Sequence, residues 1–320
     1  MKIDTHNHAL PDAAIDLIRA NPGSGLEING DVLTSSYFKI RFDAKFSDPA
    51  VKLAELERVG LEAAVLSAVP MIFGYELDET LADQLSTAVN AGLAQMCATA
   101  PDRLRWMASV PMQSPDRAAA ILQQSLAEGC VGVEIATSLM GRYFDDPFFE
   151  PFWSRAEELK LPVMIHPAYG QPHPGFDRFY LRNVIGNLLE TTVAIERLIG
   201  AGVLRDHPGL KILLVHAGGY FPFQAGRFRH AATVRSELAE SPADPWAYRG
   251  QVVVDTITHD GPALRYVVER MGLANVVMGT DIPFDMAPAE PMREVLDALG
   301  EEDARQVAEL NPAGLFGFDG

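Results

Sequence analysis

Residues 211–216 have the sequence Lys211-Ile212-Leu213-Leu214-Val215-His216, a continuous apolar run that ends in a histidine. A strand that is apolar at every position is typical of a parallel sheet covered on both faces. Similar runs recur along the chain, so the sequence predicts eight strands, at residues 2–6, 63–69, 104–110, 131–136, 162–166, 211–216, 251–256 and 275–279.

Longer amphipathic stretches alternate with these strands. They predict helices at residues 49–59, 80–98, 115–127, 148–159, 189–201, 219–236, 261–271 and 291–299, and a closing helix and turn at 304–310 and 312–316. Eight strand–helix units in 320 residues predict an α/β fold, a (β/α)8 TIM barrel that spans residues 1–320 as one domain. A doubly wound sheet is the alternative, but no glycine-rich phosphate-binding motif follows the first strand.

The first crossover, residues 9–48, is unusually long for a barrel. Within it, Asn29-Gly30 separates two short β-rich pieces, which is a strong hairpin signal. We expect a small β insertion at about residues 20–46, after the first strand and over the barrel mouth, because βα loops form the catalytic face. Residues 169–187, after the fifth strand, are expected to form a second long loop on that face.

Composition and charge describe a soluble globular enzyme. The chain is 48% hydrophobic and 22% charged, and its net charge of −17 argues against nucleic acid or an anionic membrane as a partner. The two cysteines, Cys97 and Cys130, form no disulfide framework and indicate a reducing compartment. No signal-peptide pattern precedes the first strand and no apolar run reaches the length of a membrane span, so we expect a cytoplasmic protein.

Five polar residues lie where a barrel enzyme carries its active site, at the carboxyl ends of predicted strands. They are His6, His8, His166, His216 and Asp281. Three imidazoles and a carboxylate suit Zn²⁺, with Mn²⁺, Fe²⁺ or Co²⁺ as other possibilities, and the remaining histidine is suited to moving protons. One histidine at a strand end is more often structural than a ligand, so the prediction depends on the joint pattern.

Around these residues the chain resembles the amidohydrolase superfamily, and within it the branch that includes the aminocarboxymuconate-semialdehyde decarboxylases. The motifs that carry the resemblance follow in the same order and cover almost the whole chain. They are residues 4–8 (DTHNH), 69–75 (VPMIFGY), 165–167 (IHP), 216–223 (HAGGYFPF), 226–227 (GR) and 279–284 (GTDIPF).

The resemblance implies a metal-dependent, non-oxidative decarboxylase that acts on a small unsaturated or aromatic carboxylic acid. It assigns one metal ion per subunit, usually zinc, to His6, His8, His166 and Asp281. It assigns the acid/base role that activates metal-bound water to His216, with Asp281 beside it in the catalytic group. No metal-bridging lysine is expected. Glu134, in the fourth strand, either approaches the site or is a packed residue of the barrel.

The resemblance also implies substrate contacts and a homodimer. Arg227 matches an arginine that enters the neighbouring subunit's site and binds the substrate carboxylate. A second carboxylate-binding arginine has no direct match, but Arg41 and Lys45 bracket its place, and Tyr75 is a further candidate. Ala168 replaces a tryptophan of the family. The second long loop offers four more side chains that can face a substrate: Tyr169, His173, Arg178 and Tyr180.

Other functions use the same five residues. A hydrolase of a lactone or cyclic amide and a hydratase of an unsaturated diacid both belong to this superfamily. A metal-stabilised binding protein without turnover is less favoured, because a purely structural site has no use for an additional base. These alternatives remain open from the sequence.

Overall fold

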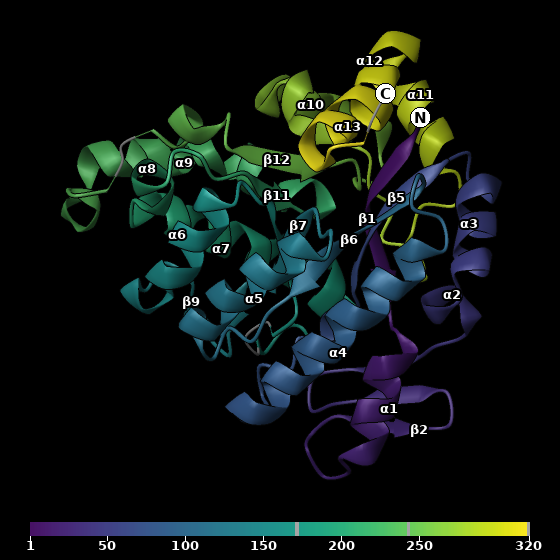
Figure 1. Ribbon diagram of the computed structural model, residues 1–320. Helices are drawn as coiled ribbons and strands as arrows, with labels where there is room; N and C mark the ends of the chain where they lie inside the picture. The colour runs from purple at the N-terminus through teal and green to yellow at the C-terminus, as the bar shows by residue number, and fades with distance from the viewer. Residues whose placement is uncertain (170–172, 242–243, 319–320) are drawn as a thin grey trace.

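Eight parallel strands form the centre of the molecule in the computed structural model, which describes residues 1–169, 173–241 and 244–318. Their order is β1 (Ile3–Ala9), β5 (Ala63–Ala68), β6 (Leu104–Ser109), β7 (Gly132–Ala136), β10 (Val163–His166), β11 (Ile212–Leu214), β12 (Val252–Asp255) and β13 (Val276–Val277). Backbone hydrogen bonds from Thr5 to Met278 (2.9 Å) and from Asp281 to His6 (2.8 Å) join the end of this sheet to its beginning. The strands thus form a nearly closed barrel, and the predicted TIM barrel is confirmed (Figure 1).

Helices flank the barrel, and most begin within two residues of their predicted positions. They are α3 (Pro49–Arg58), α4 (Glu79–Ala98), α5 (Pro115–Ala127), α6 (Glu150–Glu158), α7 (Leu188–Gly200), α8 (Val203–Asp206), α9 (Phe221–Val234), α10 (Gly261–Met271) and α11 (Pro291–Leu299). Near the carboxyl terminus α12 (Glu301–Arg305), a π-helical turn (Gln306–Leu310) and α13 (Asn311–Phe316) complete the fold. No described helix is both long and apolar enough to cross a membrane.

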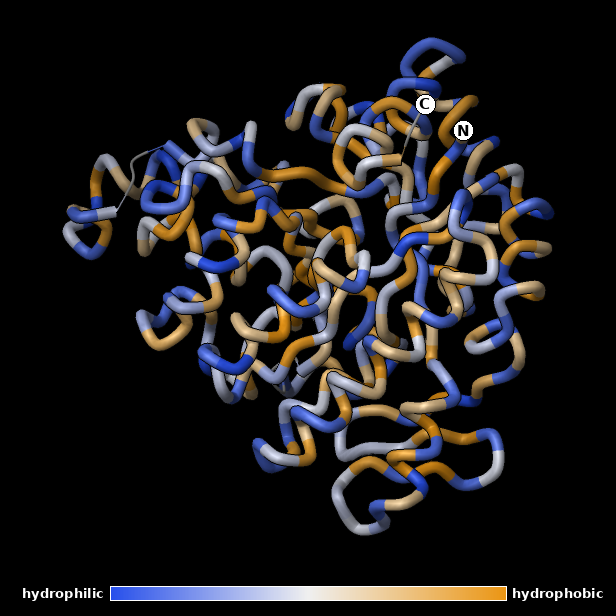
Figure 2. Tube along the Cα trace, viewed as in Figure 1, coloured by the Kyte–Doolittle hydropathy of each residue, from blue (hydrophilic) through white to orange (hydrophobic). Residues whose placement is uncertain are grey.

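Alternating side chains of the strands build two apolar layers. In β10, Val163 and Ile165 belong to the layer between strands and helices, whereas Met164 belongs to the barrel interior. Because neighbouring side chains in a strand point to opposite faces, His166 points to the interior like Met164. Figure 2 shows the hydrophobic segments gathered along the strands and the hydrophilic ones in the outer turns.

The insertion after β1 is larger than its predicted hairpin. It begins with α1 (Asp12–Ala20), continues with β2 (Glu27–Asn29), β3 (Val32–Thr34) and β4 (Lys39–Arg41), and ends with α2 (Ala44–Ser47). The three strands form an antiparallel sheet, and Gly30, at the predicted turn, has φ +61°. The hairpin is confirmed, whereas the sequence pattern did not predict α1 or the third strand. Figure 1 shows α1 and β2 beyond the carboxyl end of β1.

Two further short elements lie between the barrel units. A hairpin of β8 (Ser138–Leu139) and β9 (Arg142–Tyr143) follows β7, and a 3-10 turn (Pro147–Phe149) leads into α6. The second long loop ends in a π-helical segment, Arg182–Asn187, that continues directly into α7. Residues 170–172 of that loop lie outside the described residues.

Candidate metal centre

A register shift in β1 turns two histidines into the barrel. Ile3 belongs to the interior cluster, so strict alternation would point Thr5 and Asn7 inward. The pairing of β1 with β5 instead shifts between Asp4 and Asn7, and His6 and His8 both lie within the interior group of histidines. Both imidazoles are completely buried. A bulge of this kind re-aims side chains beside a functional site.

The four predicted ligands meet at the carboxyl ends of the strands. Their ligand atoms, from His6, His8, His166 and Asp281, all lie within 4.8 Å of one another. His6 Nε2 is 3.0 Å from His8 Nε2, and His8 Nε2 is 3.1 Å from Asp281 Oδ1. These residues lie on β1, at the end of β10 and after β13, so only the closed barrel brings them together.

The other nitrogen of each ring has an acceptor, which fixes the direction of the imidazole. The pairs are His6 Nδ1 with Asp255 Oδ2 (2.8 Å), His8 Nδ1 with Ala68 O (2.9 Å) and His166 Nδ1 with Pro167 O (2.9 Å). Since each Nδ1 donates a proton to an oxygen, each Nε2 presents a lone pair to the centre of the group.

This arrangement fits a divalent cation. Two lone pairs that face each other at 3.0 Å, on His6 and His8, repel unless a cation or proton lies between them. The buried His166 Nε2 has no hydrogen-bond partner among the described residues. Buried polar atoms are normally paired, and three imidazoles with one carboxylate are a donor set for zinc and related ions. The residues therefore form a buried site for a divalent metal.

The electrostatics of the cluster favour the metal-binding forms of His166 and Asp281. Burial lowers the pKa of His166 well below its usual value, and the neighbouring histidines lower it further. Burial alone would raise the pKa of Asp281, but the neighbouring His216 and His6 hold it well below its usual value. A neutral imidazole and an ionised carboxylate are the forms that act as ligands.

Asp255, at the end of β12, connects the ligand cluster to the neighbouring turn. Its carboxylate accepts the proton of His6 Nδ1 and the backbone N–H groups of His216 (2.9 Å), Ala217 (2.7 Å) and Ile257 (3.0 Å). Burial opposes its ionisation, but the hydrogen bond from His6 lowers its pKa overall. We did not single out this residue from sequence, although a carboxylate that ends an apolar strand is a usable signal.

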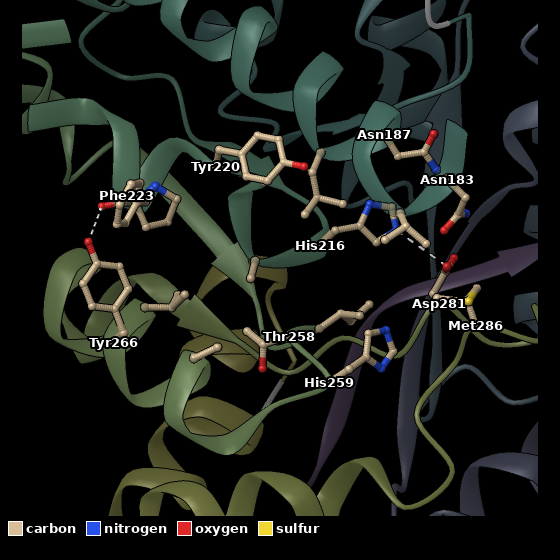
Figure 3. A pocket seen from close by; sticks show the side chains of 18 residues that line it. Asn183, Asn187, His216, Tyr220, Phe223, Thr258, His259, Tyr266, Asp281 and Met286 are labelled. Atoms are coloured by element: carbon tan, nitrogen blue, oxygen red, sulfur yellow. Dashed lines mark hydrogen bonds and ion pairs between the residues drawn. The ribbon is translucent and has the colours of Figure 1, made fainter. Parts of the chain in front are cut away.

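His216 lies beside the ligands on a strained turn. His216 (φ +54°) and Ala217 (φ +55°) have left-handed backbone conformations, which cost energy in residues other than glycine. The two backbone hydrogen bonds to Asp255 hold this turn. His216 Nε2 lies 3.6 Å from Asp281 Oδ2, and Nδ1 has no partner among the described residues. Unlike the ligands His6, His8 and His166, the imidazole is only half-buried and faces a cavity (Figure 3).

Buried polar residues of neighbouring elements surround β1, the strand that carries His6 and His8. Ser67 Oγ lies 3.3 Å from His8 Nδ1, and Glu134 Oε1 lies 3.8 Å from it. Glu134 is buried, which raises the pKa of its carboxyl group well above the usual value, and it lines neither cavity described below. Lys52, also buried, donates to Asn7 Oδ1 (2.9 Å) and to the carbonyl of His8.

Two cavities meet at His216 and Asp281. One, of about 430 Å³, extends along α9 and α10 and is lined mainly by apolar side chains, among them Tyr220, Phe223 and Tyr266. The other, of about 620 Å³, opens under the insertion and has a cationic wall. We name this wall by its four residues, Lys39, Arg41, Lys45 and Arg182.

The predicted substrate contacts have different positions. Arg41 and Lys45 line the larger cavity, but Arg41 pairs with Asp31 (2.6 Å) and Lys45 lies 3.8 Å from Glu55. Sequence reasoning missed Lys39 and Arg182 of the same wall. Neither of these two cations forms an ion pair with a described residue.

Tyr75 and Arg227 lie outside the linings of both cavities. Tyr75 is buried, with ring centroids 5.6 Å from Phe73 and 5.5 Å from Tyr169. Arg227 is exposed on α9, without an ion pair or hydrogen bond among the described residues.

The second long loop contributes one of its four predicted side chains to a cavity, Tyr180 in the larger one. Tyr169 is buried and donates its hydroxyl proton to Glu76 (2.7 Å). His173 packs on Phe176, and Arg178 lies over the ring of Phe179.

Comparisons with known proteins agree with this geometry. The amidohydrolase family model matches residues 3–318. The chain belongs to the amidohydrolase family. It is 32% identical to the 2-amino-3-carboxymuconate-6-semialdehyde decarboxylase of Dictyostelium discoideum, over 99% of this chain and 89% of that protein.

Two further relatives of this chain are also decarboxylases. The γ-resorcylate decarboxylase of Rhodococcus jostii is 30% identical, over 84% of this chain and 87% of that protein. The crystal structure of 5-carboxyvanillate decarboxylase from Sphingomonas paucimobilis matches with a TM-score of 0.85 and 25% identity, over 99% of each chain. The predicted family is confirmed.

Proposed function

We propose that this protein is a metal-dependent decarboxylase that releases CO2 from a small unsaturated or aromatic carboxylic acid. One observation carries the proposal: a buried group of three imidazoles and a carboxylate lies beside a histidine that remains open to a cavity. A purely structural metal site needs no such histidine. The decarboxylases among the relatives favour this reaction over the others of the family.

The metal ligands in this proposal are His6, His8, His166 and Asp281, and we expect one Zn²⁺ ion per subunit, with Mn²⁺ as the alternative. When bound, the ion polarises the substrate carboxylate and spreads the negative charge that develops as the carbon–carbon bond breaks. Asp281 completes the ligand set and, through its second oxygen, faces His216.

His216 is the residue that we expect to exchange protons. In this role it accepts a proton from water or donates a proton to the substrate. When CO2 leaves, the electron pair of the broken bond stays on the substrate carbon, and this carbon receives the proton. Support for this role comes from its position, since Nε2 faces Asp281 and the ring lines both cavities. The strained turn and its bonds to Asp255 keep the ring in this orientation, as general acid–base catalysis requires.

The cationic wall of the larger cavity is expected to attract an anionic acid despite the net charge of −17. We further propose a homodimer in which Arg227 binds the substrate carboxylate of the neighbouring subunit. Its exposed, unpaired guanidinium on α9 supports this role. Exposed apolar side chains of the same helix, Phe223 and Val234, are compatible with a subunit interface there.

Product analysis tests the proposed reaction. The metal-loaded protein is incubated with a panel of unsaturated and aromatic carboxylic acids, and with lactones and cyclic amides, while CO2 and organic products are measured. We expect CO2 to form in a one-to-one ratio with the loss of one acid. Ring-opened acids or hydrated diacids without CO2 would instead identify a hydrolase or a hydratase and reject the proposal.

A further inference from the structure

Two asparagines of the π-helical segment Arg182–Asn187 face the candidate site. Asn183 and Asn187 are four residues apart, so they lie on one face of the helical turn. Both line both cavities, together with His216 and Asp281. Figure 3 shows them in the smaller cavity. They therefore lie where the two cavities meet, beside the proposed acid/base group. π-Helical turns of this kind are frequent at functional sites.

The side-chain amides of these asparagines are free to bind a ligand. Both residues are half-buried, and neither amide has a hydrogen-bond partner within the parts of the chain that the structure describes. The smaller cavity around them is largely apolar, with Val184, Leu188, Tyr220, Phe223, Tyr266 and Val267 in its lining. In such surroundings a polar group is costly to leave without a partner, so a ligand that pairs with the amides gains affinity.

The chemistry of an amide limits what it recognises. Each asparagine offers two N–H donors and a carbonyl acceptor without a net charge. A hydroxyl or amino group, which both donates and accepts, matches these two amides, whereas a carboxylate is better matched by the cationic wall. The aromatic and aliphatic lining of the smaller cavity suits the ring or chain that carries this group.

We propose that Asn183 and Asn187 bind a hydroxyl or amino substituent of the substrate and thereby select hydroxy- or amino-substituted carboxylic acids. The inference rests on the proposed function in that the same acid loses CO2 at the metal cluster. It adds two specificity-determining residues that the relatives' names do not assign.

Binding to the metal-loaded protein tests this inference separately from turnover. The probes are benzoate, 2-hydroxybenzoate, 2,6-dihydroxybenzoate and 2-amino-6-hydroxybenzoate, with dissociation constants measured by titration calorimetry. The variants Asn183→Leu and Asn187→Leu keep the side-chain volume and remove the amide. Asn187→Gln keeps an amide, and Ile185→Val, in the same turn but outside both cavity linings, is the matched control.

We expect the two leucine variants to weaken the acids with two polar substituents about three- to tenfold. Benzoate should change less than twofold, the glutamine variant should recover part of the loss, and the Ile185→Val control should match the native protein. Equal weakening of all four acids, no change in any of them, or no binding of the substituted acids would overturn the inference. Binding that follows the expected pattern, together with no CO2 release from any acid of the panel that tests the reaction, would reject the proposed function alone.

Discussion

The metal cluster and the cationic wall of the larger cavity differ in whether their polar groups have partners. In the cluster, His6, His8 and Asp255 are completely buried and have fixed partners. In the cationic wall, Lys39 and Arg182 are exposed and have no ion-pair partner among the described residues. The cluster is therefore organised before any substrate arrives, whereas Lys39 and Arg182 remain available to an anionic ligand. We therefore expect the reaction to take place at the metal cluster, and Lys39 and Arg182 to contribute to attracting an anionic substrate.

Among the variants considered, His216→Asn should cause the largest loss of turnover. The variant removes the proposed proton-exchanging group but leaves the four proposed ligands, so we expect kcat to fall about 10²- to 10⁴-fold while bound metal is unchanged. Turnover and metal content are measured on the same preparation. The matched control is His230→Asn, an exposed histidine of α9, which should leave both unchanged. Near-native turnover of His216→Asn would remove this residue from the mechanism.

Replacing Asp255 with asparagine tests whether the buried carboxylate that holds His6 contributes to metal affinity. Loss of the carboxylate weakens the hold on His6 and on the turn of His216, so we expect metal affinity to fall about 10- to 100-fold. Competition with a chelator measures this affinity. Asp260→Asn, which keeps a good cap for α10, serves as the control and should have native affinity. An unchanged affinity in Asp255→Asn would contradict the positioning role.

Arg227→Ala should have a moderate effect that is confined to substrate binding. Because a charge-assisted hydrogen bond is lost, we expect KM for a carboxylic acid to rise about tenfold, with little change in kcat or metal content. Mixing Arg227→Ala with His166→Ala subunits tests the trans arrangement, since one site of each mixed dimer would then be complete. Failure of confirmed mixed dimers to recover activity would contradict it.

Among these variants, Lys45→Ala should have the smallest effect on kcat/KM. Its ammonium group is exposed and already lies near Glu55, and such surface pairs contribute little energy. We expect kcat/KM to change by less than about threefold and the midpoint of thermal unfolding to remain the same. A tenfold loss of kcat/KM would contradict this expectation. It would mean that Lys45, although paired, binds substrate as strongly as the unpaired Lys39 and Arg182.

The sequence predicted the barrel and the four residues that the structure brings together, because both depend on strong local signals. Buried parallel strands are apolar at every position, and histidines or aspartates at their ends stand out, as at His166 and Asp281. The alternation of β1 was simple in the sequence, but the register shift that turns His6 and His8 inward became visible only with the pairing to β5.

Residues whose role depends on tertiary contacts were not predictable in the same way. Lys52 lies on an otherwise ordinary amphipathic helix, and its burial against Asn7 and His8 follows from how α3 packs on the barrel. Asn183 and Asn187 belong to a π-helical turn, which has no distinct periodicity in the sequence. The third strand of the insertion, β4, is as short as β2 and β3, but no Asn-Gly turn precedes it to mark a hairpin.

A metal titration tests the central claim most directly. The protein is stripped of metal and reloaded with Zn²⁺ or Mn²⁺ in steps, while bound metal and CO2 release from the best acid of the panel are measured together. We predict that CO2 release rises in proportion to bound metal up to one ion per subunit and that His166→Ala neither binds the ion at native affinity nor releases CO2. Full CO2 release from the stripped protein, or from His166→Ala, would contradict the account.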